Sequence, residues 1–286
     1  MAQQYQVTEH SKLLAFLFVH LEGWSKKRVK QRLQGAGVSV NGEVQTRHDF
    51  MLSPNDVVSI GSVQHTSSQR SKIPLKLEIL YQDKDLIAIS KPAGLLSVGT
   101  VKENKQHALA LLRMQLSRGK HNVRLWPVHR LDRETSGILL FSTSKEVREA
   151  LMERWGEIEK VYLAIVEGKP KAEKESITQP LRMDAHTYHM HVGEHPEAKS
   201  AITHYMVKKT AAVRSLLEVR IETGRQHQIR AHMAWMGHPV VGDERYGTKG
   251  ERMGLHAYRL NIIHPVSKKA LRLKVEPMQD FYGLLV

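Results

Sequence analysis

The chain has 286 residues, of which 41% are hydrophobic, so it can bury a substantial core and is not a disordered polymer. Lysine and arginine total 43 against 29 acidic residues, and the formal net charge of +14 would attract nucleic acid, although anionic membrane surfaces attract basic proteins too. The lack of cysteine excludes disulfides, thiolate nucleophiles, iron–sulfur clusters and cysteine-ligated zinc.

The first residues of the chain lack the features of a signal peptide. Residues 1–12 are polar, and no run of about 18 uncharged apolar residues occurs anywhere in the chain. We therefore expect a cytoplasmic protein with no membrane partner and no obligate protein partner, acting as a monomer.

Residues 1–61 are predicted to form a small α+β domain, with two helices on a small sheet. The apolar stretch 13–21 predicts the first helix. Ser25 is suited to cap a second helix, in which Val29 and Leu33 form an inward pair one turn apart.

The second predicted helix is strongly basic. Five bases and no acid lie between Gly23 and Gly42, and they are Lys26, Lys27, Arg28, Lys30 and Arg32. Such a face is expected to contact RNA phosphates, which gives affinity and position but little sequence information. A solvated helix surface is the alternative interpretation.

The end of this small domain is marked by a change in pattern. The dipeptide Asn41-Gly42 favours a two-residue hairpin, and 57–60 is predicted as a closing strand. Residues 62–74 then lack a hydrophobic period and are rich in Ser and Gln, which predicts a linker.

Residues 75–286 are predicted to form the catalytic domain. The predicted strands are 75–81, 86–89, 137–141, 161–166, 217–221 and 271–275, and the predicted helices are 107–116, 145–155 and 226–236. These elements indicate an α+β fold: a mixed, mainly antiparallel sheet with helices and loops around a central cleft. The small N-terminal α+β domain is appended to it.

Asp132 is the strongest candidate for a catalytic group. It lies between Arg130 and Arg133 in the segment 129–137, which leads directly into the apolar strand 138–141. Loops on a rigid sheet often carry catalytic groups, and an ionised carboxylate can act as nucleophile or base. The alternative is a surface loop with local ion pairs, and this segment taken alone favours that alternative.

Four segments resemble the motifs of the RluA-type pseudouridine synthases. Segment 129–137 matches the active-site motif, in which His-Arg-Leu-Asp is followed two residues later by Thr-Ser-Gly. Segment 81–98 is similar to the opening hairpin and following loop of the family, 160–164 (Lys-Val-Tyr-Leu-Ala) to its second motif, and 224–230 (Gly-Arg-Gln-His-Gln-Ile-Arg) to its third. The N-terminal domain resembles, less specifically, the small RNA-binding domain named after a small-subunit ribosomal protein.

The resemblance implies isomerisation of uridine to pseudouridine in RNA, ribosomal or transfer, with no cofactor and no metal. It implies that Asp132 is the nucleophile or base, that Tyr162 guides the turned base, and that Arg225 pairs with Asp132. Arg130 would fill the space of the flipped uridine and so lower the cost of unstacking. The residues of the motif expected to contact RNA are His129, Arg130 and Arg133.

Each implied role has an ordinary structural alternative. A tyrosine in an apolar run such as 161–166 is more often part of a core, and Arg225 could be a surface charge at a helix end. Two other functions also remain open. A non-catalytic RNA-binding factor for ribosome assembly would use the same charge, and a glycosidase would need a second acid, for which Glu134 is poorly placed.

Two further groups of residues invite other interpretations. His186, His189, His191 and His195 fall within ten residues, but no Asp, Glu or Cys set completes a metal site, and the stretch resembles a variable hairpin of the family. Residues 91–94 follow a strand and are expected to form a rigid loop, either a simple turn or a support for the active site.

Overall fold

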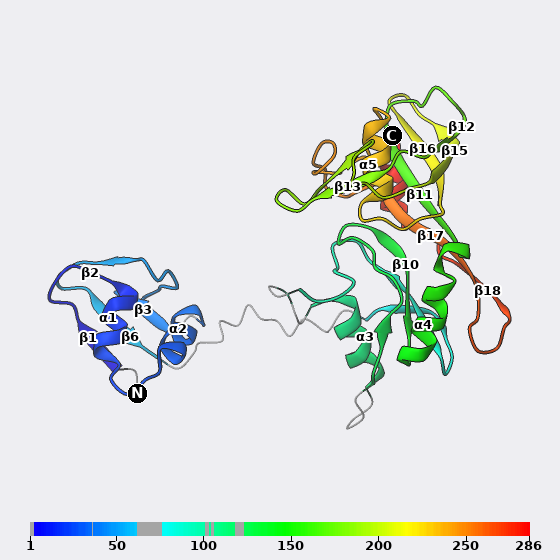
Figure 1. The fold of residues 1–286 in the computed structure, drawn as a ribbon. Helices are drawn as coiled ribbons and strands as arrows, with labels where there is room; N and C mark the ends of the chain where they lie inside the picture. The colour runs from blue at the N-terminus through cyan, green and yellow to red at the C-terminus, as the bar shows by residue number, and fades with distance from the viewer. Residues whose placement is uncertain (1–2, 36, 62–75, 101–102, 104–105, 118–122) are drawn as a thin grey trace. The chain divides into compact units, whose positions relative to one another are not determined.

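A computed structural model describes the chain except for residues 1–2, 36, 62–75, 101–102, 104–105 and 118–122. The chain folds as two compact units, Met1–Pro74 and Leu75–Val286 (Figure 1). The segment 62–74, predicted as a linker, lies outside the described residues.

The N-terminal unit packs helices α1 (Leu13–His20) and α2 (Lys26–Gln34) against a small sheet, as the sequence predicts. Strands β1 (Gln3–Gln6), β6 (Val57–Ile60), β3 (Val38–Val40) and β4 (Glu43–Val44) form a sheet in that order, and β2 (Ser11–Lys12) pairs with β5 (Met51–Leu52). One core of apolar side chains from both helices and the strands holds the unit together.

The local signals of this unit act as expected. The Ser25 hydroxyl accepts a hydrogen bond from the Arg28 amide at 3.2 Å, which satisfies a free donor at the start of α2. Asn41 and Gly42 take φ values of 53° and 87°, the left-handed values that a tight hairpin between β3 and β4 requires.

The larger unit is built on a ten-stranded, mostly antiparallel sheet, which confirms the predicted α+β class. Its main order is β12–β15–β16–β11–β17–β10–β8–β7, with β18 on β17 and β9 on β10. The bounds are β7 (Glu78–Gln82), β8 (Leu86–Lys91), β9 (Trp126–Pro127), β10 (Ser136–Ser142), β11 (Glu159–Glu167), β12 (Lys174–Ile177), β15 (Thr203–Thr210), β16 (Arg214–Ile221), β17 (Leu255–Ile263) and β18 (Ala270–Lys274). A separate hairpin joins β13 (Leu181–Asp184) to β14 (His189–Val192).

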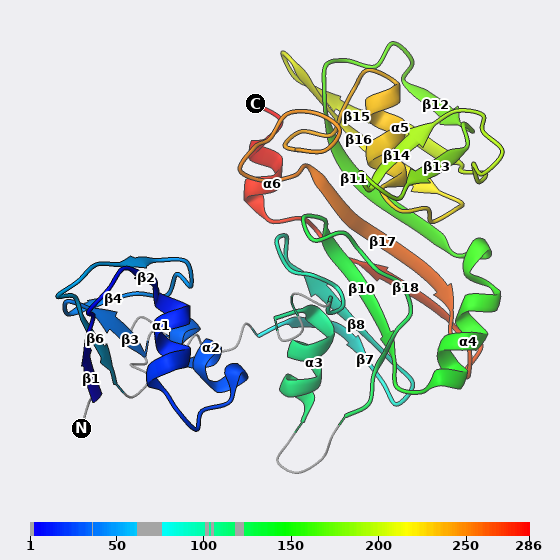
Figure 2. The same cartoon turned by 60° about the vertical axis from the view of Figure 1, so that its left-hand side comes forward.

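Helices cover both faces of the sheet. They are α3 (Ala108–Leu116), α4 (Lys145–Glu153), α5 (Gln228–Trp235) and α6 (Gln279–Gly283), with a 3-10 turn at Trp155–Glu157. Side chains of a strand alternate between its two faces, so Ile87 and Ile89 of β8 pack with α3 while Leu86 and Ala88 pack with α4. Figure 2 shows α3 and α4 flanking β8 and β10.

Strand β10 follows directly after Asp132, and its pairing with β17 is the parallel one among the named strand pairs. Gly137 lies at the contact with φ 112°, and a Cβ atom there would come within 2.2 Å of the Ala257 carbonyl oxygen. Glycine is therefore required where the loop that carries Asp132 enters the sheet.

Several elements go beyond the sequence prediction. Strands β15 and β17 were not expected, and β17 lies at the centre of the sheet, whereas the β13–β14 hairpin contains part of the histidine-rich stretch that resembles a variable hairpin of the family. The apolar run of β17 is interrupted by His256, Arg259 and Asn261. His256 is buried, and its Nδ1 lies 2.9 Å from the Ser136 hydroxyl, so the buried ring has a hydrogen-bond partner. Among the described residues, no helix is long and apolar enough to cross a membrane.

Candidate active site

The loop that carries Asp132 is fixed by two buried polar side chains. The Lys91 ammonium donates to the carbonyl oxygens of Pro92, Leu95 and Arg133 at 2.7 to 3.0 Å. Ser97 accepts from the Leu131 amide and donates to the Leu131 carbonyl oxygen. The expected rigid loop after β8 is therefore bonded directly to the segment around Asp132.

Lys91 is fully buried, and its charge is costly there. Burial lowers the pKa of Lys91 to about 7, although the nearby carboxylates of Glu134 and Asp132 oppose this shift. The three carbonyl acceptors match the three protons of an ammonium, so the side chain ties two loops together at a single point.

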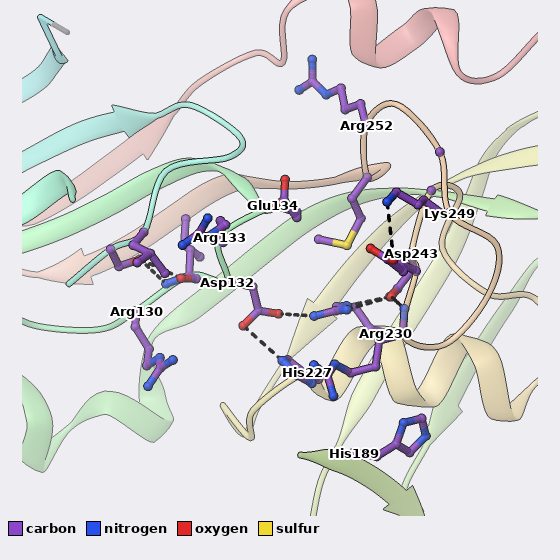
Figure 3. Close-up of a pocket in the computed structure, with 18 of the residues that line it drawn as sticks. Arg130, Asp132, Arg133, Glu134, His189, His227, Arg230, Asp243, Lys249 and Arg252 are labelled. Carbon is purple, nitrogen blue, oxygen red and sulfur yellow. Dashed lines mark hydrogen bonds and ion pairs between the residues drawn. The ribbon is translucent and has the colours of Figure 1, made fainter. Parts of the chain in front are cut away.

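Asp132 is held by an arginine from α5. The Arg230 Nη1 donates to Asp132 Oδ2 at 2.9 Å, while its other nitrogens bind Asp243 at 2.6 and 2.7 Å (Figure 3). The predicted pairing of Arg225 with Asp132 is wrong, because the Arg225 Nε donates instead to the Ser200 carbonyl oxygen at 2.9 Å. Arg225 precedes α5, whereas Arg230 lies within it and reaches across the cleft.

The charges of this cluster stabilise one another. Burial disfavours the Arg230 cation, but its hydrogen bonds and charge interactions with Asp243 and Asp132 outweigh burial and raise its pKa. Burial likewise disfavours the Asp243 carboxylate, and Arg230 more than compensates, so the pKa of Asp243 is lowered. With its side chain 21% exposed, Asp132 is the member of the cluster that solvent and substrate can reach.

A histidine faces the second oxygen of Asp132. The His227 Nε2 lies 3.8 Å from Asp132 Oδ1, and its Nδ1 is 3.0 Å from the Tyr246 hydroxyl. Burial, more than any charge nearby, lowers the pKa of His227. In the part of the chain that the structure describes, no hydrogen bond reaches Asp132 Oδ1, so this oxygen keeps its acceptor capacity.

Tyr162 forms the apolar wall beside Asp132. The pairing of β11 with β17 shifts register between Val161 and Tyr162, and such a bulge re-aims a side chain. Tyr162 and Asp132 line the same cavity of about 310 Å³, near the lower limit of small-ligand sites. Burial raises the pKa of the Tyr162 hydroxyl, and the Asp132 charge adds to the shift.

A larger cleft of about 1030 Å³ opens next to this cavity, and Asp132 lies at their junction. Arg130 lines both spaces and Arg133 lines the larger one, and both side chains are exposed. Four further bases line the cleft, namely Arg230, Arg245, Lys249 and Arg252. Acids line it in the same total number as the bases, namely Asp132, Glu134, Asp184, Asp243, Glu244 and Glu251. The structure thus brings Asp132, Tyr162, Arg225 and Arg130 to one place.

His129 does not face this cleft. Its Nε2 accepts a hydrogen bond from the Leu140 amide at 3.1 Å, and its ring lies 5.2 Å from that of Trp155. Burial lowers the pKa of His129 to about 4, so the ring is neutral and suited to accept. The expected contact of His129 with RNA is not supported by this placement, which gives it a role in fixing β10.

Four of the five bases predicted on α2 are exposed, and one is not. Arg32 is half-buried, donates to the Gly61 carbonyl oxygen and lies 5.1 Å from the centre of the Trp24 ring. Arg28 packs over the same ring at 3.9 Å. Arg32 is therefore occupied within the unit, while Lys26, Lys27, Arg28 and Lys30 remain at the surface.

One group of described residues has the spacing of a metal site. Asp83, Asp85 and His264 lie together, far from Asp132 in the sequence. The Asp83 carboxylate already accepts from the Tyr81 hydroxyl and the amides of Asp85 and Leu86, and it pairs with His264 at 2.9 Å. The His264 Nδ1 accepts from the amides of Val266 and Ser267, so these contacts account for the group as part of the local structure.

Several functional residues could not be singled out from the sequence. Arg230 was within the third motif, but the motif holds two arginines, and their spacing does not say which reaches Asp132. Asp243 and Tyr246 lie in a loop without a recognised pattern. His227 lies within the same motif, but the sequence does not indicate its place beside Asp132.

Comparisons with known proteins identify the family of this chain. A family model described as RNA pseudouridylate synthase matches residues 85–235. An uncharacterized RNA pseudouridine synthase of Mycoplasma genitalium is 32% identical over 95% of this chain and 90% of its own length. Ribosomal large subunit pseudouridine synthase D of Escherichia coli K12 is 29% identical over 92% of this chain and 86% of its own length. The tRNA pseudouridine synthase C of Haemophilus ducreyi is 37% identical over 67% and 87%.

Solved structures show the same fold. The human RNA pseudouridylate synthase domain containing 1 matches with a TM-score of 0.61 and 22% identity, over 74% of this chain and 88% of its own. The human RNA pseudouridylate synthase domain containing 4 matches with a TM-score of 0.60 and 25% identity, over 73% of this chain and 91% of its own.

Proposed function

This chain belongs to the RNA pseudouridylate synthase family, and we propose that it isomerises specific uridines of structured RNA, ribosomal RNA above all, with Asp132 as the reacting carboxylate. The observation that carries the proposal is the geometry around Asp132. One oxygen is fixed by Arg230, and the other accepts no hydrogen bond from the described residues and lies at the junction of a small cavity and a larger cleft, with Arg130 exposed at the border of both.

The reaction rearranges one nucleotide and consumes nothing. The bond between N1 of uracil and C1′ of ribose breaks, the base turns, C5 joins C1′, and a proton moves from C5 to N1. A carboxylate beside the sugar can promote the first step, either by attack on C1′ or by removal of a neighbouring proton. Asp132 Oδ1, which accepts no hydrogen bond from the described residues, would act in either step.

The neighbouring residues complete the site. Tyr162 holds the turned base against the wall of the small cavity, and its raised pKa keeps its hydroxyl protonated. Arg130, exposed at the border of both spaces, takes the place of the flipped uridine in the RNA stack. Arg225 lines the small cavity and contacts the RNA backbone near the reacting nucleotide.

The N-terminal unit supports ribosomal RNA as the substrate. The relative named for the ribosomal large subunit matches over 92% of this chain, so the match must include much of residues 1–74. The relative named for transfer RNA matches over 67%. We propose that this unit is an RNA-binding domain of the small-subunit ribosomal protein type, which contacts phosphates through the exposed bases of α2.

The decisive experiment replaces Asp132 by asparagine. Asp132→Asn keeps the shape of the side chain and removes the reacting charge, so pseudouridine formation should fall by about 10⁴-fold or more while RNA affinity changes little. Mass spectrometry of treated RNA measures the first quantity, and a filter-binding titration measures the second.

Glu134→Gln is the matched control. Glu134 is an exposed acid that lines the same cleft two residues away, and its loss should leave turnover nearly unchanged. Retained turnover in Asp132→Asn would refute the proposal, and loss of turnover in Glu134→Gln would favour a two-acid mechanism. Mapping pseudouridines in ribosomal and transfer RNA, from cells with and without the gene, identifies the substrate.

A further inference from the structure

The β13–β14 hairpin stands beside the reacting carboxylate, and its turn presents an exposed aromatic ring. Tyr188 is 64% exposed, while its neighbours Thr187 and His189 line the large cleft. The Asp184 side chain closes the turn by accepting from the amides of His186 and Thr187 at 2.8 and 3.1 Å. The turn is therefore ordered by its own hydrogen bonds.

Tyr188 occupies a backbone position that suits glycine or asparagine. Its φ of 53° lies in the left-handed region, which is unfavourable for a bulky side chain. Its ring is largely exposed to solvent, so burial of the ring offers little compensation for this strain. Strained residues of this kind cluster at ligand-binding sites, where the ligand supplies the missing contacts.

The hairpin is bonded to the loop that organises the catalytic cluster. Arg245 donates to the carbonyl oxygens of Thr187 and Tyr188 at 3.0 and 2.9 Å, and the Met190 amide donates to the Tyr246 hydroxyl at 2.9 Å. The ring of His189 lies 4.4 Å from that of Tyr246.

The same loop positions Asp132. The Asp243 carboxylate accepts from the amides of Arg245 and Tyr246 and from the guanidinium of Arg230, which binds Asp132. The backbone of Tyr188 is therefore tied through Arg245 to the loop that positions Asp132, while its ring is exposed to solvent between two residues that line the cleft. A ring carried on such a backbone can meet a neighbour of the target nucleotide.

We propose that Tyr188 stacks on an unpaired nucleobase next to the target uridine, and that the β13–β14 hairpin thereby selects RNA in which that neighbour is single-stranded. The inference rests on the proposed function. Aromatic side chains recognise single-stranded RNA by stacking on its nucleobases. Exposed basic side chains at the cleft, such as Arg245 and Lys249, bind the adjoining phosphates.

The test compares three variants of the full-length chain. Tyr188→Gly removes the ring and the backbone strain together, so thermal stability should stay equal or rise while RNA affinity falls about tenfold. Tyr188→Phe keeps the ring and should bind nearly as the parent protein does. Val213→Ala, at an exposed apolar residue of the β15–β16 turn, is the control and should change nothing.

The probe is an RNA stem-loop with one uridine in an unpaired loop, and fluorescence anisotropy measures its dissociation constant. An otherwise equal duplex, in which the neighbours of the uridine are paired, should bind Tyr188→Gly and the parent protein alike. Replacing each neighbour in turn by an abasic nucleotide should abolish the difference between the two proteins at one position, which identifies the stacked base.

Equal affinity of Tyr188→Gly and the parent protein for the stem-loop would overturn the inference, and so would an equal loss for the duplex. These binding results do not depend on turnover. A parent protein that binds the stem-loop through Tyr188 but forms pseudouridine in no RNA would refute the proposed function alone.

Discussion

The cations of α2 and the Arg230 cation of the catalytic unit carry the same charge but are held in opposite ways. Lys26, Lys27 and Lys30 are exposed, whereas the Arg230 side chain is 10% exposed and makes three hydrogen bonds to two carboxylates. Exposed cations can follow a flexible polyanion, and a buried guanidinium fixes the position of one reacting group. We therefore expect the exposed cations of α2 to contribute to RNA affinity and the buried Arg230 to contribute to the reaction.

Removing the buried cation should have the largest effect. Arg230→Met leaves the Asp243 carboxylate, whose side chain is fully buried, without its partner, so the free energy of unfolding should fall by about 3–5 kcal/mol. Turnover should fall as well, because Asp132 loses its anchor. Urea titrations and pseudouridine assays measure the two effects.

The same change on an exposed pair provides the control. Arg154 and Glu157 are bonded at 2.6 Å, but both side chains are more than half exposed, so Arg154→Met should leave stability and turnover nearly unchanged. Arg230→Lys keeps the charge without the planar fork and should recover only part of the stability. Equal losses in Arg154→Met and Arg230→Met would remove the distinction between the two kinds of cation.

His256 should give a pH-dependent effect of intermediate size. Burial lowers its pKa from 6.5 to about 4 in the folded state, so the unfolded chain binds more protons between these values. The free energy of unfolding should therefore decrease as the pH falls from about 6.5 to 4, with His256 contributing about 3 kcal/mol. In His256→Gln this decrease should be shallower when measured against pH 7.5, and an unchanged slope would contradict the assignment.

Replacing the exposed basic side chains of α2 should have the smallest effect. It should alter RNA binding and leave the stability of the protein and its turnover chemistry unchanged. Replacing Lys26, Lys27 and Lys30 by Gln should weaken RNA binding about tenfold and reduce the slope of log affinity against log salt by about two, because up to three phosphate contacts are lost.

A control with the same change in net charge replaces Lys174, Lys208 and Lys209, exposed residues on β12 and β15 outside the catalytic cleft. This control should leave the salt slope almost unchanged. Equal slopes for both triple variants would mean that α2 contributes only to the overall charge.

The sequence predicted the chemistry better than it predicted the geometry. Local signals such as the Ser25 cap and the Asn41-Gly42 hairpin act over a few residues and could be identified, as could the loop of Asp132. The partner of Asp132 could not, because Arg230 lies 98 residues further along the chain and depends on how the sheet folds. The bulge that turns Tyr162 is likewise a property of the pairing of two strands.

The central strand shows the same limit. The polar residues of β17 interrupt its apolar pattern. They are tolerated because each has a hydrogen-bond partner that only the folded sheet supplies. His256 meets Ser136, Arg259 meets Glu218 at 3.0 Å, and Asn261 meets Glu159. A strand stabilised by such contacts has no hydrophobic period to detect.

The sharing of Arg230 between Asp132 and Asp243 sets up a gradient of charge across the site. One guanidinium faces two carboxylates at the floor, which leaves an excess of one negative charge there, while Arg130 and Arg133 are exposed nearer the solvent. An uncharged uracil can approach such a floor, but a phosphate is repelled from it and attracted to the rim. We therefore expect a nucleotide to enter base and sugar first, with its phosphates left outside.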